Sequence, residues 1–362
     1  MDAGLEDVIA AQTVLSHVYG EEGRLVVRSH ELEDLVAAFG FEETAALLWE
    51  GLADPAVSAD ALPSLLGEAR REAFRLVPGL LEAATGLAPV EALRAGLALL
   101  PDAGALPAHV RVTAAAAVFA AAIARRDAGL PPVAPDPGRR HAADLLRMLH
   151  GDEPDAAHVR ALETYLVTVA DHGLNASTFA ARVVASTRAG IVSAVVAGLC
   201  ALKGPLHGGA PGPVLDMFDA IGPEEGIEPW IEARFAAKER LMGFGHRVYR
   251  ARDPRADVLK AAVLALRGGA NRVTFAERVE QAALAALARH HPGRRLDTNV
   301  EFYTALLLDA VGIPRPLFTP VFAIGRVLGW TAHAFEQLAT GRLVRPQSVY
   351  VGPPPQRRRA AE

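Results

Sequence analysis

The sequence predicts a mainly α-helical protein, and three observations support that prediction. Of the 362 residues 51% are apolar and only 6% are aromatic, with alanine and leucine dominating the apolar set. Aromatic and β-branched residues favour strands, whereas alanine and leucine favour helices. Several segments also repeat apolar residues at spacings of three and four, as a helix with one buried face does. A chain of this length has room for two domains or for one very large one.

The first helical pattern covers residues 31–52. This segment is acidic at its start, carries apolar residues at helical spacing and has Gly40 near its middle. It predicts two short helices on either side of that glycine. The alanine-rich run at 112–124 is well below the roughly 20 apolar residues that cross a bilayer, so it predicts a buried or inter-subunit helix.

Two later helices carry boundary signals. Thr274 and Glu277 form a T-x-x-E capping box, which predicts a helix beginning there. Thr319 and Pro320 predict the N-cap and first turn of another helix, and Gly341 predicts its end.

Three segments rich in proline and glycine interrupt these patterns. The stretch at 131–140 predicts a surface loop, whereas those at 208–213 and 312–316 predict crossings between two domains. We therefore expect a smaller helical domain inserted into a larger one, with hinges at both crossings. The expected bounds are 1–208 and 317–362 for the large domain and 209–316 for the small domain.

Composition and charge narrow the function classes. The formal net charge of −5 gives no general attraction to nucleic acid or to an anionic membrane. The acidic N-terminal segment lacks the basic start and apolar core of a secretion signal. The single cysteine, Cys200, cannot form an intrachain disulfide, and its apolar neighbours predict a buried structural thiol. We expect a soluble cytoplasmic protein that binds neither nucleic acid nor membrane.

One histidine, His207, stands in LKGPLHGGA among glycine, proline and small apolar residues. Metal-binding spacings such as HExxH are absent, as are the phosphate-binding patterns GxxxxGK[ST] and GxGxxG, so we expect no metal site and no cofactor. A loop histidine bonded to a backbone carbonyl is the local interpretation. Its place at a predicted hinge, with glycines that allow close approach, also fits a substrate site.

Two further segments carry candidate residues. His246 lies between Arg234 and Arg255, a stretch with seven lysines or arginines and two acids. That stretch is either a solvated basic face or a pocket for an anion, since guanidinium groups bind carboxylates and phosphates with two N–H groups. Glu301 interrupts an apolar and aromatic segment. It is either an exposed helix residue or a desolvated carboxylate, whose raised pKa would let it accept a proton near neutral pH.

Taken together and in order, these segments resemble the citrate synthase family. The resemblance runs from GLEDVIAAQT through EEGRLVVR, DHGLNASTFAARVVAST, ALKGPLHGGA, GFGHRVYRARDPR, TNVEFY and FTPVFAIGRVLGWTAHAFEQ to RLVRPQSVYVGP. It implies an all-α homodimer whose small domain closes over the substrate. The implied reaction condenses acetyl-CoA with oxaloacetate through an enolised thioester and a citryl-CoA intermediate, without a metal or redox cofactor.

The resemblance assigns a role to each candidate residue. Glu301 would take a proton from the acetyl methyl group, His207 would donate to the thioester oxygen, and His246 would polarise the oxaloacetate carbonyl. The oxaloacetate carboxylates would be held by His172, Arg255, Arg326 and Arg345, the last from the other subunit. CoA would lie near Leu241, Met242, Gly243, Phe244, Gly245 and Arg250. Asn175 and Asn299 would support the site or have a purely structural role.

Three motifs depart from the family pattern. The chain has NVEFY, DHGLN and HGGAPGP where NVDFY, DHELN and HGGANE are usual. Glu301 is one methylene longer than aspartate, and a misplacement of about an ångström can lower a rate about 10²-fold. The resemblance therefore leaves three alternatives: a citrate synthase, a 2-methylcitrate synthase that takes propionyl-CoA, or a weakly catalytic paralogue that binds CoA or a dicarboxylate. One methylene discriminates by only about 1–3 kcal/mol, so the motifs do not separate the first two.

Overall fold

The computed structural model describes residues 8–208, 211–246 and 248–353, which form sixteen α-helices and one small sheet. The all-α prediction is confirmed, with the N-terminal sheet as an addition. Arg247 of the basic segment and residues 209–210 of the first predicted crossing lie outside the described residues. The start of the GLEDVIAAQT motif lies outside them as well.

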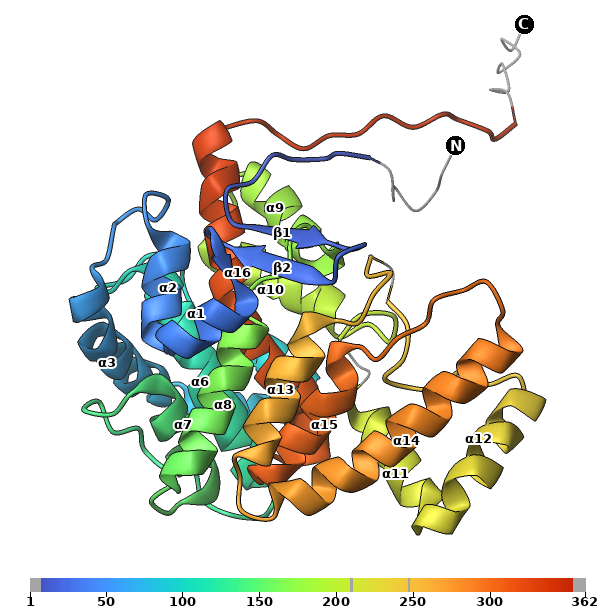
Figure 1. The fold of residues 1–362 in the computed structure, drawn as a ribbon. Coiled ribbons are helices and arrows are strands. Elements are labelled where there is room, and N and C mark those ends of the chain that lie inside the picture. Colours follow the sequence, from blue (N-terminus) through green and yellow to red (C-terminus); the bar gives the residue numbers. More distant parts are fainter. Residues whose placement is uncertain (1–7, 209–210, 247, 354–362) are drawn as a thin grey trace, which may run out of the picture.

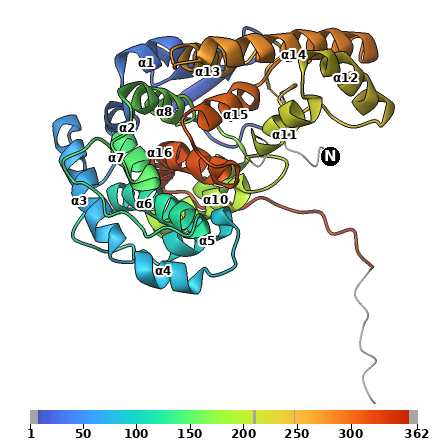
Figure 2. The same cartoon turned by 90° about the horizontal axis from the view of Figure 1, so that it is seen from below.

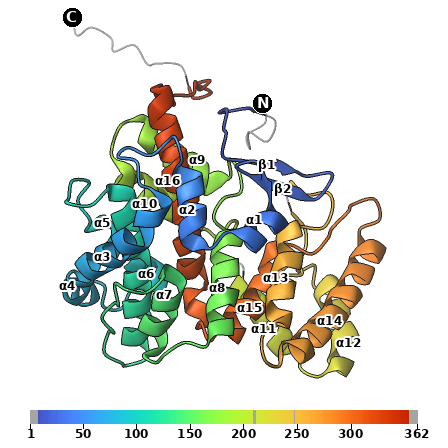
Figure 3. The same cartoon turned by 60° about the vertical axis from the view of Figure 1, so that its left-hand side comes forward.

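The chain begins with a three-stranded antiparallel sheet in the order β1, β2, β3. Its strands are β1 (Ser16–Tyr19), β2 (Arg24–Val27) and β3 (His30–Glu31). Ten helices follow: α1 (Leu32–Ala38), α2 (Phe41–Trp49), α3 (Leu62–Phe74), α4 (Val77–Ala83), α5 (Pro89–Ala98), α6 (Ala108–Asp127), α7 (His141–His150), α8 (Ala156–Thr168), α9 (Ala176–Ser186) and α10 (Ile191–Leu202). Figure 3 shows β1 and β2 above α1.

Six helices complete the described chain. They are α11 (Pro211–Ile221), α12 (Ile227–Ala236), α13 (Pro254–Leu264), α14 (Gly269–His290), α15 (Val300–Ala310) and α16 (Phe318–Thr340). Helices α11, α12 and α14 lie on one side of the molecule, and α13 and α15 lie between them and α8 (Figure 1). The division into a large and a small domain stays a prediction.

Helix α6 forms part of the core. It is long and apolar enough to cross a membrane, but 94% of its most apolar window is buried inside the protein. Its alanines let α3, α5, α7 and α16 pack closely around it. The prediction of a buried helix in this segment is confirmed.

Helix α16 runs through the middle of the molecule, as Figure 2 shows from below. It is buried on all sides, and Trp330 is completely inaccessible to solvent. A Cβ on Gly329 would lie 2.4 Å from the Ala170 carbonyl oxygen, so only glycine allows the chain after α8 to come this close. The Gly329 N–H donates to that oxygen over 3.1 Å. This contact brings the loop that carries His172 against α16.

The predicted helix boundaries are partly confirmed. Gly40 separates α1 from α2, and Gly341 ends α16 with a left-handed φ of 70°. The two threonine caps are wrong. Thr274 lies inside α14 and its Oγ1 donates to the Ala270 carbonyl, because the preceding residues are already helical. Thr319 follows the first residue of α16, and its hydroxyl donates to the Gly208 carbonyl over 3.0 Å, beside the turn that carries His207.

Cys200 is exposed, so the prediction of a buried thiol is wrong. Helix α10 buries Ala194, Gly198 and Leu199 against the protein, and Cys200 lies on its other face. Because apolar residues occur around the whole helix, the sequence does not indicate which face is buried. The loop predicted at 131–140 is confirmed, since it contains neither helix nor strand.

Candidate active site

The loop between α12 and α13 fixes the hydrogen position of His246. The backbone N–H groups of Val248 and Tyr249 donate to His246 Nδ1 over 3.0 and 3.1 Å. Because Nδ1 accepts, the proton of the neutral ring is on Nε2. Burial, with a smaller contribution from Arg255, lowers the pKa of His246 to about 4. His246 therefore presents a fixed N–H donor at neutral pH.

A second imidazole, His172, lies in the loop between α8 and α9. Its ring centre is 5.5 Å from that of His246, and its Nε2 is 3.3 Å from the Tyr249 hydroxyl. Burial lowers the pKa of His172 well below its ordinary value, and the nearby charges of Arg255 and Arg326 act in the same direction. The two rings therefore form a neutral pair, with Arg255 close to both and Arg326 close to His172.

Asp253 joins the starts of α13 and α15 and holds Arg255. The Arg255 guanidinium donates to both Asp253 oxygens over 2.9 and 2.7 Å, and the Val300 N–H donates to the same carboxylate over 3.1 Å. Asp253 and Arg255 are 1% and 3% exposed. Burial opposes the charge of Arg255, but Asp253 outweighs it and raises the pKa of that guanidinium. A fixed positive charge therefore lies at the start of α15.

The first turn of α15 carries Glu301. Asn299 caps this helix by accepting the Glu301 N–H over 3.0 Å, and its amide donates to the Gly245 carbonyl over 2.9 Å. Asn299 thus connects the loop of His246 to the helix of Glu301. Burial raises the pKa of Glu301 to about 7, while Arg255 opposes this rise and Asp253 adds to it. A carboxylate with that pKa can both accept and release a proton near neutral pH.

His207 lies in the turn after α10 and contacts the first turn of α9. Its Nε2 is 2.9 Å from Ser177 Oγ, and the Trp330 indole N–H donates to the same hydroxyl over 3.1 Å. Asn175 caps α9 by accepting from the N–H groups of Ser177 and Thr178. Asn175 therefore supports His207 indirectly, through the serine that the ring touches.

The remaining buried guanidinium belongs to Arg326 on α16. Its Nε donates over 2.6 Å to the carbonyl of Val169, which lies three residues before His172. Burial lowers the pKa of Arg326 to about 10, so the group stays charged at neutral pH. Arg326 and His172 are thus held next to each other by the backbone between them.

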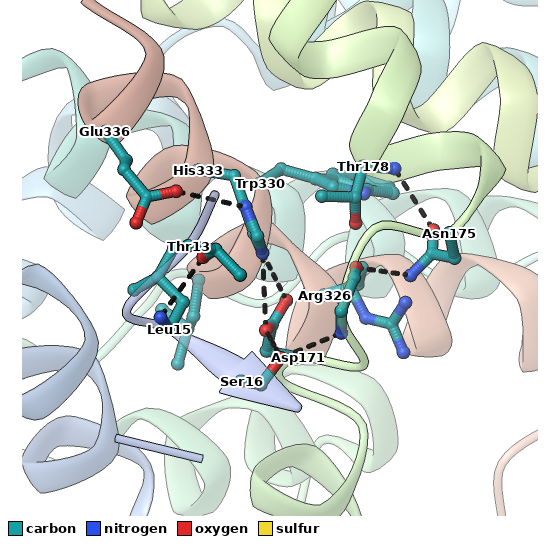
Figure 4. A network of polar contacts seen from close by, with 12 residues as sticks. Thr13, Leu15, Ser16, Asp171, Asn175, Thr178, Arg326, Trp330, His333 and Glu336 are labelled. Carbon is teal, nitrogen blue, oxygen red and sulfur yellow. Dashed lines mark hydrogen bonds and ion pairs between the residues drawn. The ribbon is translucent and has the colours of Figure 1, made fainter. Parts of the chain in front are cut away.

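A network of polar contacts positions the His172 loop (Figure 4). The Arg182 guanidinium donates to His333 Nδ1 over 3.0 Å and also pairs with Glu336. His333 Nε2 consequently donates to Asp171, the neighbour of His172, over 3.3 Å. Although burial opposes its charge, His333 and the Ser16 hydroxyl hold the pKa of Asp171 below its ordinary value.

The predicted CoA-binding turn lies directly beside the start of α15. Asn299 N–H donates to the Gly243 carbonyl over 3.0 Å, and Gly245 N–H donates to the Asp297 carbonyl over 2.7 Å. Phe244 pairs with Thr298 between them. The predicted residues of this turn are Leu241, Met242, Gly243, Phe244 and Gly245. Backbone hydrogen bonds therefore link the turn to the residues directly before Glu301.

Two predicted residues lie apart from the cluster. Arg250 is exposed, although its loop contributes to the site. Arg345 is exposed in the extended segment that follows α16. The basic segment is partly a solvated face, since Lys238, Arg240 and Arg250 are exposed, and partly paired with acids. Arg252 pairs with Asp257 and Glu280, and Arg234 pairs with Glu239.

Sequence reasoning missed several residues that this geometry brings forward. The clearest are Asp253, Ser177, Asp171 and Tyr249. Only Asp253 had a local signal, because aspartate followed by Pro254 is a typical N-cap with a first-turn proline. The others act through partners far away in the sequence.

The predicted residues that converge are His172, His207, His246, Arg255, Arg326 and Glu301. A neutral imidazole donor, His246, and a carboxylate of raised pKa, Glu301, both close to Arg255, suit removal of a proton from a carbon acid. Two buried guanidiniums suit a co-substrate with carboxylates. Within the described residues no group of three metal-ligating side chains occurs. The fold and site define a helical enzyme of the general acid–base class.

Comparison with known proteins agrees with that class. The family described as "Citrate synthase, C-terminal domain" matches residues 4–347. Putative citrate synthase 2 of Mycobacterium tuberculosis is 38% identical over 361 residues, covering 97% of this chain and 93% of that protein. The 2-methylcitrate synthase of the same organism is 36% identical over 364 residues, covering 96% and 90%.

A solved structure shows the same fold. The citrate synthase of Thermoplasma acidophilum, in a ternary complex with carboxymethyl coenzyme A and oxaloacetate, superposes with a TM-score of 0.85 at 26% identity and covers 99% of this chain and 97% of its own. The chain belongs to the citrate synthase family. It is an acyltransferase of the type that condenses an acyl-CoA with oxaloacetate.

Proposed function

We propose that acetyl-CoA is the acyl donor and that the products are citrate and CoA. The observation that carries this proposal is Glu301, a carboxylate whose pKa burial raises to about 7, next to the buried Arg255. Such a group is basic enough to take a proton from the methyl group of a thioester once a donor stabilises the enolate.

The condensation has two steps, and different residues act in each. Glu301 removes the methyl proton while His207 donates an N–H to the thioester oxygen, where negative charge develops. The resulting carbon nucleophile attacks the oxaloacetate carbonyl, and His246 donates its Nε2–H to the carbonyl oxygen. Water then hydrolyses citryl-CoA to citrate and CoA. The neutral state of His246 supports its role as a donor that gives up a proton only as the alkoxide forms.

Substrate binding follows from the fixed charges. His172, Arg255 and Arg326 would hold the oxaloacetate carboxylates, and the 241–245 turn with Arg250 would lie along CoA. Arg345 would come from a second copy in a cytoplasmic homodimer. The segment that carries Arg345 extends away from the body of its own chain, which supports a role across a subunit boundary (Figure 1).

A second candidate is 2-methylcitrate synthesis from propionyl-CoA, because a 2-methylcitrate synthase is among the relatives. Release of CoA thiol from acetyl-CoA and from propionyl-CoA, each with oxaloacetate, separates the two. We expect the larger kcat/KM with acetyl-CoA. A larger value with propionyl-CoA would favour the second candidate, and no release with either would contradict both.

The pH dependence of the reaction should show the ionisation of Glu301 on the acid side. Glu301 must be ionised to act as a base, so kcat/KM for acetyl-CoA should rise through about pH 7 and fall about tenfold per unit below it. His246, with a pKa of about 4, and His172 stay neutral throughout and add no further step. Initial rates from pH 5 to 9 measure this, and a profile flat between pH 5.5 and 8 would exclude Glu301 as the base.

A further inference from the structure

The N-terminal hairpin, residues 15–28, contacts both of the loops that carry the paired histidines. Strands β1 and β2 pair from Ser16 opposite Val27 to Tyr19 opposite Arg24, and the turn between them reads Gly-Glu-Glu-Gly. Leu25 is 1% exposed, and so anchors the hairpin to the core. The hairpin is therefore held against the core between its base and its tip.

The base of the hairpin contacts the His172 loop. The Ser16 hydroxyl donates to Asp171 and accepts the Gly173 N–H over 2.8 Å. One side chain thus holds the residues on both sides of His172. Asp171 also receives the His333 hydrogen bond, so the base is linked to α16.

The tip of the hairpin contacts the His246 loop (Figure 1). The Arg250 N–H donates to the Gly20 carbonyl over 2.8 Å. A Cβ on Gly20 would lie 2.4 Å from the Val248 carbonyl oxygen, and one on Gly23 would lie 2.7 Å from the Arg252 carbonyl oxygen. Real Cβ atoms do not approach backbone oxygens this closely, so any side chain at either position forces the hairpin tip and the loop apart.

The Gly20 contact falls on Val248, one of the two residues that hold His246. Its Nδ1 accepts from the backbone of Val248 and Tyr249, and Arg250 follows directly. His172 precedes the predicted crossing at 208–213, and His246 follows it. The hairpin therefore connects two loops that belong to parts of the chain expected to move relative to each other.

We propose that the hairpin is a positioning element, in which Ser16 at its base and Gly20 and Gly23 at its tip set the distance between His172 and His246. Its effect should fall on the dicarboxylate co-substrate, which both histidines would contact. Glu301 and His207 lie on other elements, α15 and the turn after α10, so the acyl-CoA half of the site should change less. The kinetic part of this inference rests on the proposed function.

Gly20→Ala and Gly23→Ala test the tip, with Gly51→Ala as the matched control. Gly23 and Gly51 have nearly the same left-handed φ, +65° and +68°, but nothing lies within 4 Å of a Cβ on Gly51. Both substitutions carry the same backbone strain, and only the one at Gly23 clashes with the loop. Ser16→Ala tests the base separately, since it leaves the tip unchanged.

Two measurements are made on the full chain. Hydrogen exchange of the 246–252 amides should increase in Gly20→Ala and Gly23→Ala and stay unchanged in Gly51→Ala. The kcat/KM for oxaloacetate should fall about 10- to 100-fold in the tip variants, the range expected when a catalytic group moves by up to about 1 Å. The KM for acetyl-CoA should change less, because Arg250 is the only predicted CoA-binding residue in the shifted loop. Ser16→Ala should raise the KM for oxaloacetate, because it removes the hydrogen bonds that hold the His172 loop.

Unchanged exchange in the tip variants would overturn the inference, whatever the kinetics. Increased exchange with unchanged kcat/KM would also overturn it, because the contact would then be only structural. Equal losses in Gly23→Ala and Gly51→Ala would assign the effect to backbone strain. If the unaltered protein releases no CoA while exchange increases as expected, the proposed function fails and the contact with the His246 loop still stands.

Discussion

Glu301→Gln should lower kcat by about 10²- to 10⁴-fold, the usual contribution of a general base. Glutamine keeps the shape of the side chain but cannot accept the methyl proton. CoA release measured with saturating oxaloacetate and acetyl-CoA gives the rate. Glu301→Asp is the control, because aspartate restores the residue of the NVDFY pattern and should retain measurable turnover. A fully active Glu301→Gln variant would mean that another group is the base.

The same substitution should make the protein more stable at pH 8. Burial raises the pKa of Glu301 from 4.5 to about 7, so ionisation of this group destabilises the folded state as the pH rises through that range. A shift of that size corresponds to about 3 kcal/mol as an upper value. The increase in the free energy of unfolding should therefore be largest above pH 7 and absent at pH 4.5. Equal effects at both pH values would contradict a desolvated carboxylate.

Asp253→Ala should lower the free energy of unfolding by about 3–5 kcal/mol, because it leaves the buried Arg255 guanidinium without its partner. It also removes the acceptor of the Val300 N–H at the start of α15. Denaturant unfolding at neutral pH measures the loss. Affinity for oxaloacetate should fall together with stability, since Arg255 is no longer held in place.

Asp155→Ala is the matched control for that prediction. Asp155 also caps a helix, accepting the Ala157 N–H over 2.7 Å, but it is exposed and holds no arginine. Its removal should cost much less than the removal of Asp253. Similar losses for the two variants would show that Asp253 acts only as a helix cap.

The fold class, the central residues of the site and the two capping asparagines, Asn175 and Asn299, could be predicted from the sequence, whereas the other supports could not. His207 and Glu301 stand out locally, because each is an ionisable residue whose immediate neighbours are apolar or small. The residues that hold them are distant: Ser177 meets Trp330 across 153 positions and Asp253 meets Val300 across 47. Nothing in either local sequence marks such a partner, because the pairing depends on how the helices pack.

The errors have an equally local cause. The T-x-x-E pattern at Thr274 fits the interior of a helix as well as its start. The hydroxyl donates to the carbonyl of Ala270, four residues earlier. Around Cys200 every neighbour is small or apolar, so the pattern gives no direction for the buried face of α10. A correct prediction in both cases depends on which helices pack nearby, and the local sequence does not show this.

The exposure of Cys200 affects how turnover should be recorded. Reagents that detect released CoA react with any accessible thiol, and the only cysteine of this chain is accessible. Each molecule of protein therefore adds one thiol to the signal before any substrate is consumed. Cys200→Ser would remove this background and would leave the protein free to accept a single reporter thiol at a chosen position, such as the hairpin tip.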